Sequence, residues 1–169
     1  MQVKETIEPL GLYGGALDWS AMRFQSEITV ARSSAEVAAF FDDPNNLVRW
    51  DKSVARIEIR SAGPAAEGFT FDTIAPSGMR MTYRIAEHEP ERRTTIELVS
   101  ASMFRRAIWY MSYDPVPDGV RIGCAVEFRL RARYALLIIP LVVRQRGALR
   151  RDLLQLKDAI ERAYPRQAN

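Results

Sequence analysis

The sequence predicts an α+β protein in which a curved antiparallel sheet of seven strands wraps around one long C-terminal helix. Seven short segments alternate apolar and polar side chains, which is typical of strands with one buried face. The segment after Pro140 instead repeats its apolar residues every three or four positions, which is typical of an amphipathic helix. A sheet with one apolar face needs a cover, and only this long helix is large enough to provide it.

The first strand and two short helices are predicted near the N-terminal end of the domain. The segment RFQSEITVA, residues 23–31, alternates over its whole length. Ser33 and Glu36 then have the spacing of a capping box, and Pro44 suits the first position of a second short helix. Residues 1–21 have no clear period and carry three glycines, so we expect an irregular extension there.

Six further strands follow, and their inward faces contain large apolar side chains. The alternation predicts an inward set of Phe69, Phe71, Met79, Met81 and Tyr83. In RRAIWYMSY both faces are apolar, so the pattern leaves the register open. The two candidate faces are Trp109, Met111 and Tyr113 on one side and Ile108 and Tyr110 on the other. Asp118 and Gly119 indicate a tight turn, so we expect the last two strands to form a hairpin.

The composition is typical of one globular domain with a small net charge. The formal net charge of +3 over 169 residues is too small to indicate nucleic-acid binding, and the aromatic side chains are predicted to face inward. One cysteine and one histidine exclude an internal disulfide and a zinc site of the usual Cys/His type, so we expect no metal. The first residues lack a continuous apolar core, so we expect no signal peptide and a cytoplasmic protein.

The longest apolar run, from Tyr134 to Val143, lies between two groups of arginines. As a helix it would cover about 15 Å, roughly half of what a bilayer core requires, so it cannot span a membrane. Peripheral contact with a membrane surface stays open. We expect the strand pattern to end near Arg133 and the long helix to begin near Pro140, with the run capping one end of the sheet.

Arg146 interrupts the apolar stripe of the long helix. The stripe runs through Val142, position 146, Leu149, Leu153 and Leu156. An arginine therefore occupies a position where the pattern demands an apolar side chain. It either extends to the surface or points into the interior, where its guanidinium would stabilise an enolate or bind a carboxylate. The sequence leaves both orientations open.

Other residues with reactive side chains have simpler interpretations. His88 lies in AEHEPERR, which we interpret as an exposed turn between strands. Cys124 alternates with apolar inward residues, which predicts a buried core side chain. Asp42, Asp43 and Asp51 flank the second short helix and suit capping or turn roles. No inward histidine, aspartate or glutamate is predicted, and this favours a noncatalytic role somewhat.

The order of these elements, together with DDPNNLVRWDKSV and LRRDLLQLKDAIERA, resembles the polyketide cyclase/dehydrase branch of the START-like (SRPBCC) superfamily. The resemblance covers residues 22–164, which we expect to be a single ligand-binding domain followed by a tail at 165–169. It implies the helix-grip fold and an elongated apolar cavity between sheet and long helix, closed by the two short helices. Family members include aromatic polyketide cyclases, lipid and sterol carriers and hormone receptors, so the resemblance does not by itself define a reaction.

On this fold, the candidate catalytic residues are Tyr83 and Arg146, which would polarise a carbonyl and stabilise the developing oxyanion. The candidate ligand-binding residues are Phe41, Trp50, Phe69, Phe71, Met79, Met81, Trp109, Met111, Tyr113 and Val142. Ordinary core packing explains Met81, Tyr83 and Trp109 equally well. Trp50 either closes over a ligand or fastens its helix to the sheet.

Two functions remain open, and both require an internal cavity for a hydrophobic small molecule. The first is a cofactor-independent polyketide cyclase or dehydrase, in which the cavity folds a poly-keto chain so that an enol carbon meets a carbonyl. The second is a noncatalytic carrier or sequestering protein for a lipid or another hydrophobic ligand. The sequence does not define the oligomeric state and leaves a homodimer open.

Overall fold

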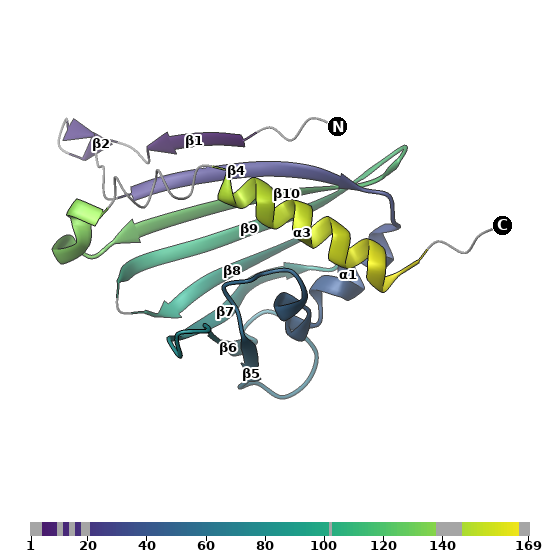
Figure 1. Cartoon of the computed structure of the whole chain (residues 1–169), viewed down its shortest axis with the longest axis horizontal. Coiled ribbons are helices and arrows are strands. Elements are labelled where there is room, and N and C mark those ends of the chain that lie inside the picture. Colours follow the sequence, from purple (N-terminus) through teal and green to yellow (C-terminus); the bar gives the residue numbers. More distant parts are fainter. Residues whose placement is uncertain are drawn as a thin grey trace.

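The computed structural model describes residues 5–9, 12–13, 16–17, 21–101, 103–137 and 147–165. Eight strands form one antiparallel sheet in the order β1-β4-β10-β9-β8-β7-β6-β5. These strands are β1 (Glu5–Pro9), β4 (Ala21–Val30), β5 (Arg56–Ile59), β6 (Thr70–Ile74), β7 (Arg80–Glu89), β8 (Arg93–Ser100), β9 (Phe104–Val116) and β10 (Gly119–Leu130). The helices are α1 (Ser34–Phe41), the 3-10 helices η1 (Pro44–Arg49) and η2 (Ala132–Leu137), and α3 (Ala148–Ala163). Figure 1 shows the curved sheet with α3 lying across its concave face, so the helix-grip fold is confirmed.

The seven predicted strands are β4 to β10, and the eighth comes from the N-terminal segment. Residues 5–9 pair with β4, with Ile7 opposite Phe24 and Glu5 opposite Ser26. Leu12–Tyr13 (β2) and Ala16–Leu17 (β3) form a separate two-stranded sheet. The expectation of an irregular segment is therefore wrong for these residues. An edge strand carries unpaired backbone groups, and β1 supplies partners for those of β4.

The two short helices form where their capping residues predict them. The Ser33 hydroxyl accepts a hydrogen bond from the Glu36 backbone at 3.3 Å, and the Glu36 carboxylate accepts one from the Ser33 backbone at 2.8 Å. Asp43 caps η1 by accepting a hydrogen bond from the Asn45 backbone at 3.0 Å, and Pro44 begins that helix. Both predictions are confirmed.

The predicted hairpin joins β9 to β10 through Gly119. Its φ of +138° lies in the region that side chains disfavour, and an added Cβ would lie 2.1 Å from the carbonyl oxygen of Val30. Only glycine allows the start of β10 to lie this close to the end of β4. Pairing in this hairpin also settles the open register. Trp109, Met111 and Tyr113 lie opposite the inward-facing Val126, Cys124 and Ile122, respectively.

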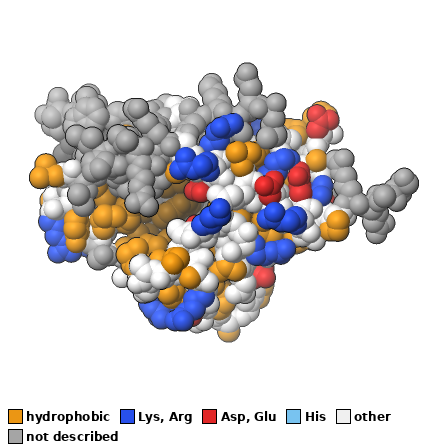
Figure 2. Space-filling view, viewed as in Figure 1, with side chains coloured by type: hydrophobic (Ala, Val, Ile, Leu, Met, Phe, Trp, Pro, Cys, Tyr) orange, Lys and Arg blue, Asp and Glu red, His pale blue; other side chains and the backbone are white. Residues whose placement is uncertain are grey.

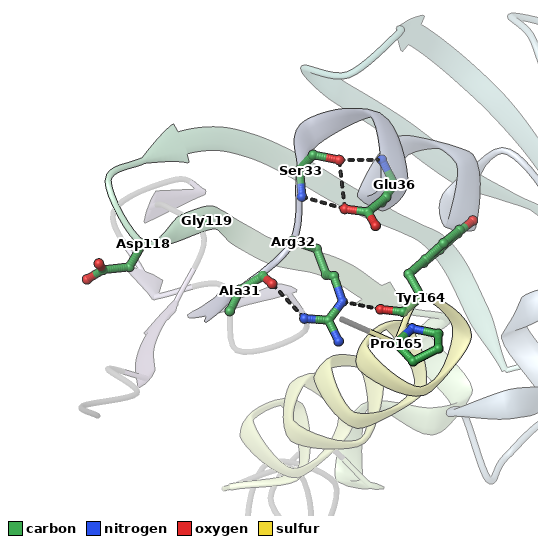
Figure 3. A pocket seen from close by; sticks show the side chains of 8 residues that line it. All are labelled: Ala31, Arg32, Ser33, Glu36, Asp118, Gly119, Tyr164 and Pro165. Atoms are coloured by element: carbon green, nitrogen blue, oxygen red, sulfur yellow. Dashed lines mark hydrogen bonds between the residues drawn. The ribbon is translucent and has the colours of Figure 1, made fainter. Parts of the chain in front are cut away.

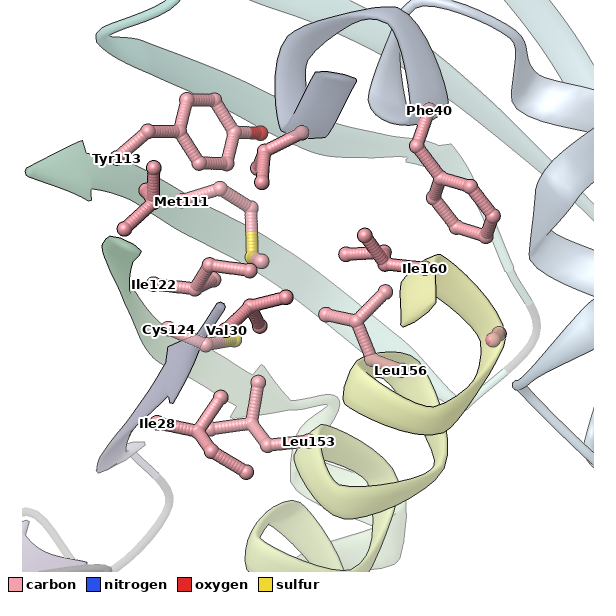
Figure 4. Close-up of a cluster of buried hydrophobic side chains, with 13 residues drawn as sticks. Ile28, Val30, Phe40, Met111, Tyr113, Ile122, Cys124, Leu153, Leu156 and Ile160 are labelled. Carbon is pink, nitrogen blue, oxygen red and sulfur yellow. The ribbon is translucent and has the colours of Figure 1, made fainter. Parts of the chain in front are cut away.

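The main core lies between α3, α1 and the strands β4, β9 and β10. Figure 4 shows Leu153, Leu156 and Ile160 of α3 pointing toward Ile28 and Ile122 of the sheet. Leu156, Ile160 and Ile122 are fully buried. Cys124 belongs to the same cluster, so the prediction of a buried core cysteine is confirmed. We call this group the packed cluster; its buried members are Ile28, Val30, Val37, Phe40, Met111, Tyr113, Val120, Ile122, Cys124, Leu153, Leu156, Ala159 and Ile160.

The long helix is described from Ala148, which follows Gly147 with a φ of +70°. The predicted start near Pro140 lies outside the described residues, as do Val142 and Arg146. The described part of the apolar run forms η2. Within the described residues, no helix has both the length and the hydropathy needed to cross a membrane.

Candidate functional site

Three aromatic side chains form a row across β6, β7 and β9, away from the packed cluster. Tyr83 stacks on Phe71 with ring centroids 5.6 Å apart, and it meets Trp109 edge-on with centroids 5.4 Å apart. Phe69 extends the row, with its ring centroid 6.5 Å from that of Phe71. Phe69 and Phe71 are buried, whereas Tyr83 and Trp109 are only partly buried. We call Phe71, Tyr83 and Trp109 the aromatic row.

A strand irregularity positions Tyr83 within this row. Thr82 pairs with Ser100, but the next residue, Tyr83, pairs with Leu98, so Val99 of β8 has no opposite residue on β7. Such a bulge bends the strand and changes the direction of nearby side chains. Val99 is exposed, whereas Tyr83 turns toward Phe71 and Trp109.

The Tyr83 hydroxyl is held as a hydrogen-bond donor. It lies 3.6 Å from Sδ of Met81, which is a weak acceptor. Burial raises the pKa of Tyr83 to about 12. The phenol therefore stays protonated near neutral pH and can donate to a stronger acceptor, such as a ligand carbonyl.

Met79 and Met81 differ in their positions. Met81 is partly buried beside Tyr83, as the alternation predicts. Met79 is 50% exposed and lies before the first residue of β7, so its predicted inward orientation is wrong. The reason is a turn: the Met79 carbonyl accepts a hydrogen bond from the Ala75 backbone, and Gly78 between them has a φ of +82°.

Phe41, Met111 and Tyr113 lie at the packed cluster and not in the aromatic row. Met111 and Tyr113 are almost fully buried there, and the Phe41 ring lies 4.9 Å from that of Tyr113. Trp50 follows η1 and packs against the same cluster. These contacts support the fastening role of Trp50, and its closure over a ligand stays a prediction. Arg146 and Val142 lie outside the described residues, so their predicted roles also stay predictions.

His88 is not the exposed turn residue that we expected. It lies in β7 opposite Thr94, and its side chain is only 11% exposed. Its Nδ1 lies 3.2 Å from the Thr94 hydroxyl and its Nε2 lies 3.5 Å from the Asp42 carboxylate at the end of α1. The prediction fails because β7 continues to Glu89 where a turn was expected, with an irregularity between Ile85 and Glu87 that shifts the alternation by one residue. His88 thereby links α1 to the sheet.

An acidic residue that was not predicted lies on the inward side of α3. Asp152 is partly buried, and burial raises the pKa of its carboxyl to about 6, with Asp51 adding to this effect. Asp152 lies three residues after Leu149 and four before Leu156, so the helical period would have placed it on the stripe. The prediction that no inward acid exists is therefore wrong.

Cavities among the described residues have different characters. Figure 2 shows a hollow bordered by hydrophobic side chains in the left half of the view. It lies over the part of the concave face that the described part of α3 leaves uncovered. A recess of 510 Å³ at the opposite end is lined by polar residues, including Arg32, Glu36 and Asp118. There, Nε of Arg32 donates to the Tyr164 carbonyl at 2.5 Å (Figure 3). Its Nη2 donates to the Glu161 carbonyl at 2.9 Å. Arg32 thus caps the C-terminal end of α3, and this recess has a structural explanation.

A smaller groove of 250 Å³ lies outside the core, between η1 and α3. It is lined by Val48, Arg49, Trp50 and Lys52 on one side and by polar residues of α3 on the other. No cluster of three His, Cys, Asp or Glu side chains in the described part of the chain could hold a metal ion.

Residues 21–161 match the protein family described as "Polyketide cyclase / dehydrase and lipid transport". The chain belongs to this family. The match spans nearly the whole sheet and most of α3, and therefore includes the aromatic row and Asp152. No curated protein matches the chain by sequence.

Solved structures of similar fold include enzymes and proteins named without an activity. The di-domain ARO/CYC StfQ from the steffimycin biosynthetic pathway aligns over 84% of this chain and 50% of its own, with a TM-score of 0.68 and 12% identity. Norcoclaurine synthase from Thalictrum flavum aligns over 85% of this chain and 86% of its own, with a TM-score of 0.64 and 15% identity. A protein of Thermus thermophilus aligns over 83% of this chain and 98% of its own, with a TM-score of 0.68 and 17% identity. The chain spans about half the length of the di-domain proteins. At these identities, the likeness establishes the fold alone.

Proposed function

We propose that this protein binds a hydrophobic small molecule against the aromatic row and cyclises or dehydrates a poly-keto or aromatic substrate there without a cofactor. The observation that carries the proposal is the partial burial of Tyr83 and Trp109 on the inner side of the sheet. Large aromatic side chains that stay partly exposed form the kind of apolar surface that small ligands cover. Met81 beside them adds an adaptable side chain that suits ligands of varied shape.

Tyr83 is the candidate that would act on a carbonyl. Its hydroxyl is protonated, and its weak contact with the Met81 sulfur is easily exchanged for one with a carbonyl oxygen. A hydrogen bond from Tyr83 would stabilise the negative charge that develops on this oxygen during enolisation or ring closure. Arg146 remains a second candidate for this charge on the sequence alone.

The family description names both a reaction on polyketides and the transport of lipids. Both activities involve a hydrophobic ligand, so the description supports this part of the proposal. The names of StfQ and norcoclaurine synthase, both similar in fold, indicate that this fold can carry enzymes. Neither name transfers a substrate to this chain, so the reaction is argued from the aromatic row and Tyr83.

Binding is tested by fluorescence titration with N-phenyl-1-naphthylamine, an uncharged apolar fluorophore. We expect saturable binding to the wild-type chain and a Kd about ten-fold higher for Trp109→Ala, since part of the aromatic surface is lost. Ile59→Ala is the control, because Ile59 is an exposed apolar residue on the edge strand β5. Absence of saturable binding, or equal Kd values for all three proteins, would contradict the proposal.

Catalysis and carriage are separated by incubating the chain with a linear poly-keto thioester and analysing the mixture by mass spectrometry. A cyclised product that has lost water supports the cyclase/dehydrase function. Recovery of the unchanged compound in complex with the protein would instead indicate a carrier.

A further inference from the structure

A buried hydroxyl without a partner lies beside the aromatic row. Among the described residues, the side-chain hydroxyls of Ser26, Thr73 and Tyr113 are buried and have no hydrogen-bond partner. Ser26, which pairs with Cys124, and Tyr113 lie at the packed cluster. Thr73 lies on β6, two residues after Phe71 of the aromatic row, and is only 3% exposed. Most buried polar groups in proteins are hydrogen-bonded, so this hydroxyl calls for an explanation.

The strand pairing places Thr73 on the same face of the sheet as Tyr83. On β7, Met81 lies opposite Thr73 and Tyr83 lies opposite Phe71, so the four residues form two successive cross-strand pairs on the inner face. On β5, the residue opposite Thr73 is Ile57. A hydrocarbon side chain accepts no hydrogen bond and a thioether is a weak acceptor. The neighbouring strands therefore leave the Thr73 hydroxyl without a good partner.

The Tyr83 hydroxyl lies toward the same place. The Tyr83 ring stacks on Phe71, and its hydroxyl lies 3.6 Å from Sδ of Met81, the residue opposite Thr73. Diagonal neighbours in an antiparallel pair are about 7–8 Å apart, a distance that a tyrosine side chain can span. Burial raises the pKa of Tyr83 and the Thr73 hydroxyl acts against this rise, as expected for hydroxyls that face each other. The Met81 side chain therefore lies beside both hydroxyls.

The Met81 side chain occupies this place without satisfying either hydroxyl well. Its sulfur is a weak acceptor for Tyr83, and the Thr73 hydroxyl has no partner among the described residues. A methionine has three rotatable side-chain bonds, and Met81 is only partly buried, so its thioether can move aside. An oxygen atom in the place of the sulfur would be within reach of both donors.

We infer that Thr73 is a second hydrogen-bond donor of this site, and that a ligand's carbonyl oxygen replaces the Met81 sulfur and accepts hydrogen bonds from Thr73 and Tyr83. The inference rests on the proposed function and extends it, because it names ketones as the class of ligand and defines where the carbonyl lies. The hydrocarbon part of the ligand then covers Tyr83 and Trp109. Two donors to one oxygen stabilise the negative charge that develops there during enolisation.

The test compares β-tetralone, an apolar ketone, with tetralin, which has the same bicyclic skeleton but no carbonyl oxygen. Each compound displaces N-phenyl-1-naphthylamine from the full chain, and the fluorescence gives its Kd. Thr73→Val keeps the shape of the side chain and removes the hydroxyl. We expect this variant to raise the Kd for β-tetralone about three- to ten-fold and to leave the Kd values for tetralin and the fluorophore within about two-fold of wild type.

The stability of the ligand-free chain separates a binding role of Thr73 from a structural one. Since its hydroxyl has no partner, Thr73→Val should not lower the free energy of unfolding in urea. Thr95→Val is the matched control, because Thr95 is also buried but donates a hydrogen bond to the Glu87 carboxylate at 3.1 Å. Thr95 precedes Ile96, the residue opposite Trp109, and so faces the other side of the sheet. This control should lose stability and keep the Kd for β-tetralone within about two-fold of wild type.

Three results would contradict the inference about Thr73 while the binding proposal stands. They are equal or no changes in the Kd values for β-tetralone and tetralin, a loss of stability in Thr73→Val, and a wild-type chain that binds the fluorophore but not β-tetralone. If the fluorophore does not bind to the wild-type chain, the proposed function itself is wrong and the inference falls with it.

Discussion

The concave face of the sheet has two regions that arise from the same alternating pattern but differ in packing. Where α3 crosses β4 and β10, side chains such as Ile122 and Leu156 are fully buried and close-packed. Across β6, β7 and β9, Tyr83 and Trp109 remain partly covered by the described residues. Inward orientation alone therefore does not distinguish a core from a binding surface. The difference lies in which part of the sheet the helix covers.

The largest effect on stability should come from the packed cluster. Leu156→Ala removes a fully buried side chain and leaves a cavity, so the free energy of unfolding should fall by about 2–5 kcal/mol. Urea denaturation measures this change. Leu136→Ala, at a position that is 93% exposed, should alter stability by less than about 0.5 kcal/mol. A small effect at Leu156 would mean that the two regions do not differ in packing.

A second contribution to stability comes from the Asp72 carboxylate, which is fully buried on the outer face of β6. Arg60 binds it with two hydrogen bonds of 2.7 Å, and Arg80 forms a further ion pair with it. Asp72→Asn should lower the free energy of unfolding by about 3 kcal/mol at pH 7, because Arg60 loses its charged partner and Arg80 keeps only Glu58. Glu58→Gln, which affects a more exposed acid paired with Arg80, should cost less than about 1 kcal/mol.

The pH dependence of stability provides an independent check on Asp72. Hydrogen bonds from Arg60, together with Arg80, hold the pKa of Asp72 well below its usual range. Because the folded pKa lies below the unfolded value of about 3.9, the stabilisation is present above about pH 4 and is lost as the pH falls further. Asp72→Asn should remove this acid-dependent loss. An unchanged acid profile would contradict the account.

At Asp152 the pH dependence of the free energy of unfolding should have the opposite sign. Burial raises its folded pKa to about 6, so the charged form destabilises the folded state increasingly as the pH rises from about 4 to about 6. Asp152→Asn should therefore raise the free energy of unfolding by about 1–2 kcal/mol at pH 7 and leave it nearly unchanged at pH 4. Urea denaturation at both pH values measures this difference. Destabilisation at pH 7 would indicate that the carboxylate has a structural partner.

The smallest effect is expected for the Tyr83 hydroxyl. Tyr83→Phe keeps the stacked ring and removes only the donor, so the Kd for N-phenyl-1-naphthylamine should stay within about two-fold of wild type. The Kd for β-tetralone should rise about three- to ten-fold, which corresponds to one hydrogen bond of about 1 kcal/mol. Equal effects on the two ligands would show that the hydroxyl does not contact the carbonyl.

Elements with an uninterrupted pattern were predictable from the sequence. Alternation along β4 and β10 defines their inward faces, and the Ser33 capping box and Gly119 define the first short helix and the last hairpin. Prediction failed where local irregularities shift the alternation, as the one at Ala86 does for His88, and where a turn precedes the strand, as at Met79.

Strand β1 and Asp152 differ in how far the sequence defines them. Strand β1 is defined by its pairing with β4, which its own sequence does not reveal. The apolar members of the helix stripe do not reveal Asp152, which is the polar member between Leu149 and Leu156. The same helical period that identified Arg146 as an interruption would have identified Asp152. A polar residue within an apolar stripe is therefore the more informative signal.

The methyl groups of Met79 and Met81 offer the most direct test of the central claim, which is that a hydrophobic ligand lies against the aromatic row. Met81 is partly buried beside Tyr83, whereas Met79, two residues earlier, is half-exposed in a turn. In a chain with 13C-labelled methionine methyl groups, saturating N-phenyl-1-naphthylamine should shift the Met81 signal strongly through ring currents and leave the Met79 signal in place. A complex in which the Met81 signal does not move would contradict the account.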